Sequence, residues 1–203
     1  MSAPPDHRAV YDRSAAEWDR RRATAFVERP WIDSILTQLP EGSDVLDLGC
    51  GSGRPIAAEF LAAGHFVTGM DFAPAMLALA RARYPQGTWI LGDMRALSLG
   101  RRFQALVAWN SFFHLTADEQ RSLIPRLVGH LAPAGWLLLT TGPKAGEAWG
   151  SVSGGAVWHA SLERAEYLDL FVQQGLALVR HVSEDPHTTG HTVWLLRRGP
   201  VAA

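Results

Sequence analysis

The segment that most constrains the fold of this chain is residues 44–53, Asp-Val-Leu-Asp-Leu-Gly-Cys-Gly-Ser-Gly, which joins a short apolar run to three alternating glycines. Glycine adopts positive φ without strain and lets a ligand approach the backbone where a Cβ would stand in the way. Turns of this kind connect a strand to a helix and hold nucleotides at the helix N-terminus. The segment therefore predicts a strand, a glycine turn and a helix that together bind a nucleotide-like ligand.

The spacing and charge of this turn argue against a ligand that carries phosphate. A dinucleotide fingerprint reads G-x-G-x-x-G, but here the third glycine, Gly53, comes one place early and is followed by Arg54. Asp47 lies just before the turn, where its carboxylate would repel a pyrophosphate. A cationic ligand without phosphates is favoured instead.

S-adenosylmethionine has this character, because it joins a phosphate-free adenosine to a sulfonium and to an amino acid whose ammonium can lie near Asp47. Asp71 ends the next apolar run, about where Rossmann-type sheets place the acid that bonds the ribose hydroxyls. It is equally suited to cap the following helix, and one carboxylate can do both. Asp93 follows a third run and either accepts a hydrogen bond from the adenine amino group or only caps a short turn.

With these residues in view, the chain resembles the class I S-adenosylmethionine-dependent methyltransferases, in particular small bacterial single-domain members that act on small molecules. The resemblance runs from Tyr11 to Arg197. It implies that the glycine turn wraps the methionine part of the cofactor, that the Met94 backbone helps to read the adenine, that Asn110 borders the methyl group and that Tyr11 covers the site. The predicted cofactor-binding residues are Tyr11, Asp47, Gly49, Gly51, Gly53, Arg54, Asp71, Phe72, Met76, Asp93, Met94 and Asn110.

Three of these residues have equally ordinary alternative roles. Arg54 either pairs with the carboxylate of the cofactor or is solvated in the first helical turn, where an arginine opposes the helix dipole. Phe72 and Met76 either pack on the adenine or belong to the core between helix and sheet.

Composition indicates one domain, residues 1–203, that acts on small molecules. A chain of 203 residues with 47% apolar content can bury a single sizeable core. The net charge of -1 and the scattered basic residues make nucleic acid a poor candidate partner. Cys50 is the only cysteine, the first residues lack the apolar segment of a secretory signal, and no apolar run approaches a membrane helix. We therefore expect a cytoplasmic enzyme with a small-molecule acceptor and no metal, and we make no prediction of its oligomeric state.

The order of apolar runs predicts a doubly wound α/β fold. Near-continuous apolar runs, typical of buried parallel strands, lie at residues 44–48, 66–70, 88–91, 104–109 and 135–141. Helical patterns fill most of the gaps, and residues 1–40 are expected to form a helical cover. The runs at 176–182 and 192–197 are joined by a short turn-rich link that favours an antiparallel hairpin. The prediction is a Rossmann-like sheet of seven strands, mostly parallel with the last strand antiparallel, and a ligand beyond the carboxyl ends of the strands.

His114 is the candidate catalytic residue. It follows the fourth predicted strand, where the transferred methyl group would emerge, and as a base it can take a proton from the acceptor. The alternative is a histidine that braces the loop by bonding the backbone. A base is optional, because methyl transfer from a sulfonium is a displacement at an activated carbon for which alignment and desolvation can suffice.

Residues 142–160 are expected to form a substrate lid loop. The segment contains five glycines, and long loops in compact domains are usually functional or disordered. We predict that Trp149, Trp158 and His159 line the acceptor pocket. The alternative is a flexible loop anchored by one buried tryptophan.

Other functions are compatible with parts of the pattern. An NAD-dependent oxidoreductase is disfavoured by the glycine spacing, by Asp47 and by a shortage of groups for a proton relay, since the chain has three tyrosines and the single lysine Lys144. A non-catalytic scaffold or sensor that binds S-adenosylmethionine would bind without turnover. Nucleic-acid methylation is disfavoured because residues 110–113, Asn-Ser-Phe-Phe, lack the Pro-Pro-Tyr type motif of base-methylating relatives.

Overall fold

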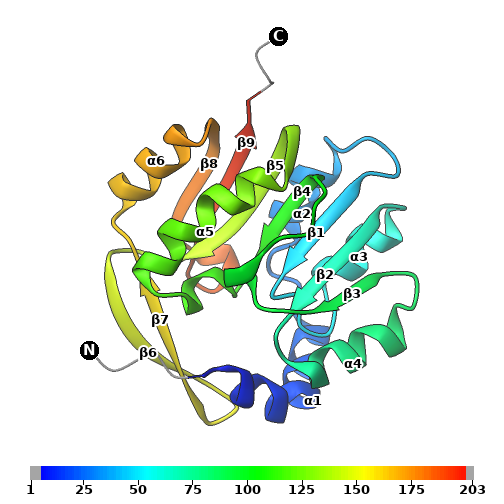
Figure 1. Cartoon of the computed structure of the whole chain (residues 1–203). Helices are drawn as coiled ribbons and strands as arrows, with labels where there is room; N and C mark the ends of the chain where they lie inside the picture. The colour runs from blue at the N-terminus through cyan, green and yellow to red at the C-terminus, as the bar shows by residue number, and fades with distance from the viewer. Residues whose placement is uncertain (1–5, 200–203) are drawn as a thin grey trace.

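The computed structural model describes residues 6–199, which form a seven-stranded sheet with helices on both faces (Figure 1). Strands β1 (Asp44–Leu48), β2 (Phe66–Asp71), β3 (Thr88–Leu91), β4 (Phe103–Ala108) and β5 (Leu131–Thr141) are parallel. Strands β8 (Leu176–Asp185) and β9 (His191–Arg198) complete the order β3-β2-β1-β4-β5-β9-β8, and β9 is antiparallel to both neighbours. The predicted fold class, including the reversed last strand, is confirmed.

The chain changes direction across the sheet at β1. Strands β2 and β3 lie to one side of β1, and the chain then returns to place β4 on the other side. Two diverging connections leave a crevice beyond the carboxyl ends of the strands at such a point, and open α/β sheets bind their ligands there.

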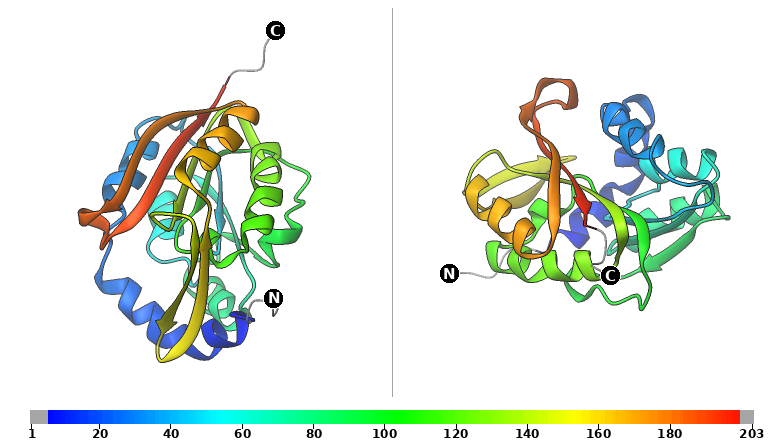
Figure 2. Two further views of the ribbon diagram at one scale, coloured as in Figure 1. Left: turned by 90° about the vertical axis from the view of Figure 1, so that its left-hand side faces the viewer. Right: turned by 90° about the horizontal axis from the view of Figure 1, so that it is seen from above.

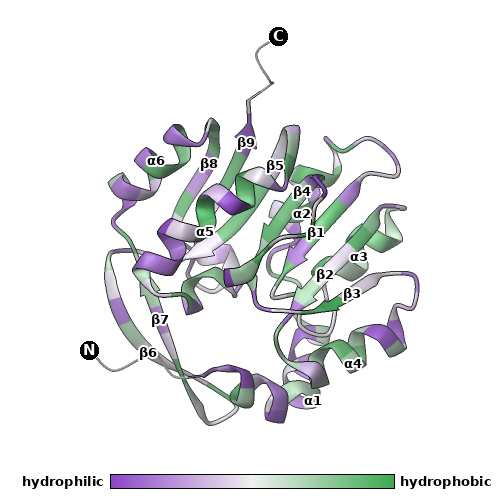
Figure 3. Cartoon of the chain, viewed as in Figure 1, coloured by the Kyte–Doolittle hydropathy of each residue, from purple (hydrophilic) through white to green (hydrophobic). Residues whose placement is uncertain are grey.

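Two hydrophobic layers cover the faces of the sheet. Helices α2 (Arg29–Leu36), α3 (Ile56–Ala62) and α4 (Pro74–Arg83) pack on one face, whereas α5 (Ala117–Gly129) and α6 (Arg164–Gln173) pack on the other. Side chains of each strand alternate between the layers, so that Val45 faces the first layer and Leu46 and Leu48 face the second. Both faces are buried, which explains the near-continuous apolar runs of the parallel strands, seen as green stretches at the centre of Figure 3.

The N-terminal helix and a β-hairpin extend across the carboxyl ends of the parallel strands. Helix α1 (Arg8–Thr24) packs against α4 and against the hairpin of β6 (Gly146–Val152) and β7 (Gly155–Ser161). Figure 2 shows the hairpin projecting from the main sheet toward α1. Of the expected cover at residues 1–40, α1 lies over the strand ends and α2 packs on the sheet face, while residues 1–5 fall outside the described residues.

The lid loop expected at residues 142–160 is instead this β-hairpin. Strands β6 and β7 pair antiparallel, with Trp149 opposite Trp158. The turn residues Ser153 and Gly154 have φ of 48° and 79°, and two successive positive φ values give the turn whose twist matches that of hairpin strands. The loop prediction was wrong because four of the five glycines that suggested it lie within the two strands or at the turn between them.

The length and charge of the helices determine whether any of them could cross a membrane. The longest, α1, has 17 residues and is rich in charge. Within residues 6–199, no helix is both long and apolar enough to cross a membrane.

Candidate functional site

A cavity of about 290 Å³ opens at the carboxyl ends of the first four strands, with α1 as one of its walls. Its lining contains the catalytic candidate His114 and every predicted cofactor-binding residue except Gly53. It also contains residues that the sequence did not single out, among them His7, Trp18, Arg22, Arg95, Trp109 and Glu119. The structure therefore brings the predicted residues together around one space.

The three glycines of the turn have different surroundings. Gly49, Gly51 and Gly53 all have positive φ, of 72°, 54° and 79°. A Cβ at Gly49 would lie 2.3 Å from Cβ of Ser111, whereas a Cβ at Gly51 would meet its nearest neighbour only at 3.8 Å. Gly53 does not line the cavity, and a Cβ there would lie 2.9 Å from Cη2 of Trp89. We therefore correct its predicted role from cofactor contact to close packing between helix and strand, the usual task of the third glycine.

Asp47 is a buried carboxylate in the cavity wall that receives no hydrogen bond from residues 6–199. It is 3% exposed, and burial and the charge of Asp71 raise its pKa to about 7, with the charge of Arg22 opposing them. A carboxylate in such a place is stabilised by a cation that also brings N–H donors. The ammonium of the predicted cofactor has both properties, so Asp47 fits that group.

Arg22 is a site residue that the sequence analysis missed. It lies near the end of α1, lines the cavity and forms an ion pair with Glu28, whose side chain is fully buried. Burial lowers the pKa of Arg22 to about 10, and the charge of Asp47 opposes that effect. With the half-buried Arg54, it places a second cation in the lining, so the site contains partners for the carboxylate of the predicted cofactor as well as for its ammonium.

Asp71 organises the turn around it. One carboxylate oxygen accepts from the backbone N–H of Gly51 at 2.8 Å, and the other accepts from that of Ala73 at 2.8 Å. Burial raises its pKa to about 6, although these hydrogen bonds favour the ionised form. The expectation was that one oxygen caps the following helix while the other faces the ribose. Both oxygens instead hold backbone, and each keeps a second lone pair for a ligand hydroxyl.

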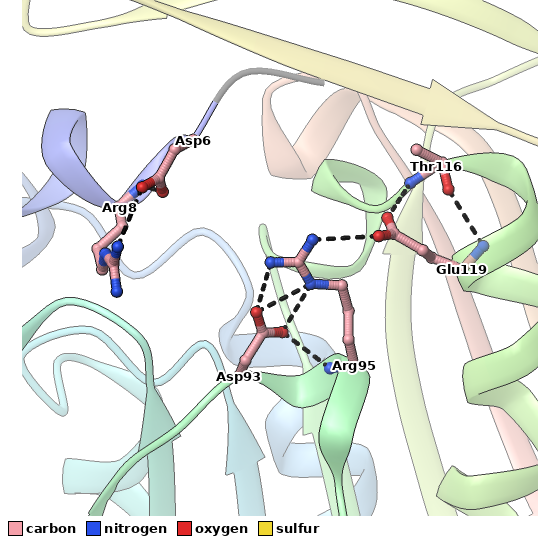
Figure 4. Close-up of polar contacts among 6 residues, drawn as sticks. All are labelled: Asp6, Arg8, Asp93, Arg95, Thr116 and Glu119. Carbon is pink, nitrogen blue, oxygen red and sulfur yellow. Dashed lines mark hydrogen bonds and ion pairs between the residues drawn. The ribbon is translucent and has the colours of Figure 1, made fainter. Parts of the chain in front are cut away.

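Asp93 lies in a cluster of charges at the cavity (Figure 4). Its carboxylate accepts from Nε of Arg95 at 2.9 Å, and Nη1 of Arg95 donates to Glu119 at 3.1 Å. Burial raises the pKa of Asp93, but the hydrogen bonds and charge of Arg95 outweigh it and leave the pKa lowered. A second pair, Arg8 with Asp6 at 3.2 Å, comes from the N-terminal segment. The predicted adenine acceptor is thus in place, but Arg95 competes for it.

His114 bonds partners on both sides of its ring. It ends the short helix η2 (Phe112–His114); its Nε2 lies 2.7 Å from the Tyr11 hydroxyl and its Nδ1 lies 3.1 Å from the Trp158 carbonyl oxygen. Burial lowers the pKa of His114 to about 3, more than the Trp158 carbonyl raises it. Burial and the charge of Asp71 raise the pKa of Tyr11. His114 therefore braces the backbone, as the alternative interpretation expected, and also faces the cavity.

Two polar groups at the end of β4 have no partner among residues 6–199. Nε1 of Trp109 and Oδ1 of Asn110 are buried without a hydrogen bond, and both residues line the cavity. Asn110 has a φ of 53°, and its backbone N–H donates to Thr140 at 2.9 Å. Buried polar atoms are normally satisfied, so an open donor and acceptor here fit a polar ligand at the predicted position of the methyl group.

Aromatic side chains form the wall on the α1 side. Tyr11 meets Trp18 and Phe72 edge to face, with ring centroids 5.8 Å and 6.1 Å apart. Met76 is 1% exposed and packs in the same cluster. Phe72 and Met76 belong to the packing between α1 and α4, as one of the two interpretations expected, and they also line the cavity.

The residues predicted to line an acceptor pocket do not line this cavity. Trp149 is 66% exposed, and Trp158 is buried in the hairpin, where its backbone reaches His114. The ring of His159 packs on those of Phe113 and His114 at centroid distances of 4.7 Å and 4.9 Å.

Acidic and imidazole groups in the described part of the chain do not assemble a metal site. No group of three histidine, cysteine or carboxylate side chains among residues 6–199 is arranged to hold a metal ion.

Comparison with known sequences finds a family match over the strands that carry the site. Residues 45–135 match the family described as methyltransferase domain. The chain is 31% identical over 133 residues to dTDP-4-amino-2,3,4,6-tetradeoxy-D-glucose N,N-dimethyltransferase from Saccharopolyspora spinosa, over 64% of this chain and 52% of that protein. The chain spans about half the length of the curated relatives it matches.

Solved structures with the same fold cover almost the whole chain. The CcbJ methyltransferase from Streptomyces caelestis superposes with a TM-score of 0.76 at 21% identity, covering 96% of this chain and 100% of that one. The 1,6-didemethyltoxoflavin-N1-methyltransferase from Burkholderia thailandensis, solved with 1,6-didemethyltoxoflavin and S-adenosylhomocysteine, gives a TM-score of 0.73 at 19% identity, covering 98% and 93%. At these identities the likeness shows a shared fold.

Proposed function

We propose that this chain is a class I S-adenosylmethionine-dependent methyltransferase that transfers a methyl group to a small-molecule acceptor. When bound, S-adenosylmethionine supplies a methyl group on a sulfonium, which the lone pair of an acceptor takes by in-line displacement. The residues of the chain bind and align the reactants and exclude water.

The observation that carries the proposal is the buried Asp47 carboxylate beside the glycine turn. It receives no hydrogen bond from residues 6–199, and its pKa is raised to about 7 by burial and by the charge of Asp71. A ligand with an ammonium relieves this cost, and Arg22 and Arg54 offer a counter-charge for a neighbouring carboxylate. A phosphate-bearing cofactor would add repulsion at the same place.

We propose further that the acceptor atom is an amine nitrogen. Tyr11 and Trp158 occupy both ring nitrogens of His114, and burial lowers its pKa to about 3, so the ring does not hold an extra proton at neutral pH. A neutral amine attacks without first losing a proton, whereas a hydroxyl profits from a base. The relative from Saccharopolyspora spinosa, named as an N,N-dimethyltransferase of an amino sugar, supports the same choice. His114 then positions the Tyr11 hydroxyl rather than acting as the base.

The acceptor proposed here is a small molecule and not a nucleic acid. The net charge of -1 leaves no excess of basic residues to hold a phosphate backbone. A cytoplasmic location is also part of the proposal, since Cys50 is the only cysteine and is buried and free.

Calorimetric titration with S-adenosylhomocysteine, beside NADH and ATP, tests the cofactor. We expect micromolar binding of S-adenosylhomocysteine alone, and binding of NADH instead would refute the argument from Asp47. Release of S-adenosylhomocysteine from S-adenosylmethionine is then measured over matched amines and alcohols. Turnover with amines is expected; turnover with alcohols alone contradicts the choice of nitrogen, and binding without any turnover favours a non-catalytic scaffold.

A further inference from the structure

The outer edge of β7 meets two histidines at a single residue, Trp158. The Trp158 backbone N–H donates to Nε2 of His7 at 3.0 Å, and its carbonyl oxygen is 3.1 Å from Nδ1 of His114. The two imidazole rings meet edge to face, with centroids 4.8 Å apart. His7 is 5% exposed and Trp158 is 6% exposed, so water does not readily replace either bond.

These partners determine where the imidazole protons lie. A carbonyl oxygen only accepts, so Nδ1 of His114 carries its proton and Nε2 keeps a lone pair. The Tyr11 hydroxyl, at 2.7 Å, donates to that lone pair and turns its own oxygen lone pairs elsewhere. A backbone N–H only donates, so Nε2 of His7 is the unprotonated nitrogen. The Trp158 peptide therefore sets the tautomer of His114 in the way that carboxylates set catalytic imidazoles.

The bond from His7 anchors Trp158 in addition to the packing of Val152 and Val157 against α1. A two-stranded hairpin is marginally stable in water by itself, and the residue opposite Trp158, Trp149, is 66% exposed. His7 directly precedes α1, so its bond ties the hairpin to the helix that supplies Tyr11. Without it, the Trp158 carbonyl can move away from His114, and the ring can adopt the other tautomer.

We propose that His7 is a positioning residue, which through the backbone of Trp158 fixes the Nδ1–H tautomer of His114 and so directs the Tyr11 hydroxyl in the cavity. This inference rests on the proposed function, because it gives the hairpin a part in that activity. The hairpin then acts through the backbone of Trp158 rather than through the indole that the sequence suggested.

Nitrogen-15 NMR of the labelled histidine rings tests the inference. Wild-type His114 is expected to show one protonated nitrogen, Nδ1, and one unprotonated nitrogen. His7→Leu keeps apolar bulk without an acceptor, and we expect its His114 nitrogens to shift toward a common average. Exchange of the Trp158 amide should become roughly fivefold faster, as for the loss of one hydrogen bond.

A matched variant separates hydrogen bonding from packing. His7→Gln places an amide oxygen where it can accept from Trp158 and is expected to restore the wild-type signature. His187→Ala, at an exposed histidine in η3 (Pro186–Thr188), is the control and should leave both readouts unchanged. An unchanged signature in His7→Leu, or a His7→Gln variant that behaves like His7→Leu, overturns the proposal.

Acidification of the wild-type protein gives the same test if a variant does not fold. Protonation of His7 removes the lone pair that accepts from Trp158. Burial and the charge of Arg95 lower the pKa of His7 and outweigh the charge of Asp6, which raises it. The neutral rings of His114 and His159 lie in the same cluster. As the pH falls, the exchange rate of the Trp158 amide and the nitrogen-15 signature of the His114 ring should both change at the titration midpoint of His7. A change at another midpoint, or none, contradicts the inference.

Calorimetry on the same samples keeps the two proposals apart. Wild-type protein that does not bind S-adenosylhomocysteine refutes the proposed function, whatever the imidazole signature shows. Variants that bind it normally while the His114 tautomer is unaffected refute only the role of His7.

Discussion

Replacing Asp47 with asparagine should stabilise the ligand-free protein and weaken cofactor binding. The carboxylate is buried, and its pKa is about 7 in the folded protein against an ordinary 3.8. At about 1.36 kcal/mol for each pH unit, this difference corresponds to a cost of up to about 4 kcal/mol once the group is ionised. Asparagine removes the charge and keeps the shape.

The pH dependence follows from the direction of the shift. Between pH 4 and 7 the folded protein holds a proton on Asp47 that the unfolded chain has released, so stability falls as the pH rises through this range and is level above it. About 2 to 3 kcal/mol of the loss lies between pH 5 and pH 8. The stability gained by Asp47→Asn should therefore be larger at pH 8 than at pH 5 by that amount.

Urea unfolding of wild type and variant at both pH values measures this difference, and any constant effect of the new amide cancels. Asp44→Asn, at the other end of the same strand, controls for the substitution itself. Calorimetry at pH 8 should show binding of S-adenosylhomocysteine weakened by about 10- to 100-fold, the loss of a hydrogen bond to a charged group. A gain that is equal at the two pH values would refute the electrostatic account, and unchanged affinity would remove Asp47 from the site.

Three further predictions separate binding from packing. Gly53 has a φ of 79°, and a Cβ there would clash with Trp89, so Gly53→Ala should lower the free energy of unfolding by about 1–3 kcal/mol. The affinity of the folded protein for S-adenosylhomocysteine should stay unchanged in calorimetry. A loss of affinity alone would restore the role of Gly53 as a cofactor contact. Arg22→Met leaves the Glu28 carboxylate buried and unpaired and should lower the free energy of unfolding by about 3–5 kcal/mol. Adding Glu28→Gln should recover stability in thermal unfolding but not the affinity for S-adenosylhomocysteine. Recovery of both would mean that Arg22 is only structural. Trp149→Ala, at a 66% exposed position, should change stability by at most about 1 kcal/mol and leave turnover with an amine acceptor intact, whereas lost turnover would return this indole to the acceptor pocket.

The local pattern of apolar residues was enough to predict the strands of the sheet, because each buried strand is apolar on both faces. The strand predicted at residues 44–48 agrees with β1, and the prediction at residues 88–91 agrees with β3. The acids Asp71 and Asp93 were found for a related reason, since the carboxyl ends of parallel strands meet at one edge of the sheet. A residue that directly follows a parallel strand in the sequence can therefore be placed at this edge without knowledge of the structure.

Other features depend on contacts between distant segments. The Arg95–Glu119 bond joins residues 24 positions apart, and the Tyr11–His114 bond joins residues 103 apart. No periodicity marks such partners. Arg22 was missed because it reads as one of several charges at the end of a helix, and only the packing of α1 shows that it reaches the cavity.

The pairing of Asp93 with Arg95 gives the end of the cavity that we propose to hold the adenine an unusual dependence on ionic strength. The two side chains are 40% and 52% exposed, so dissolved salt screens their attraction, with a Debye length of about 8 Å in physiological saline. An uncharged amino group that bonds Asp93 must compete with the guanidinium, and its bond is hardly screened. Added salt therefore weakens the competitor more than the ligand. The affinity for adenosine alone should rise with salt, although charged ligands usually bind less tightly as salt increases.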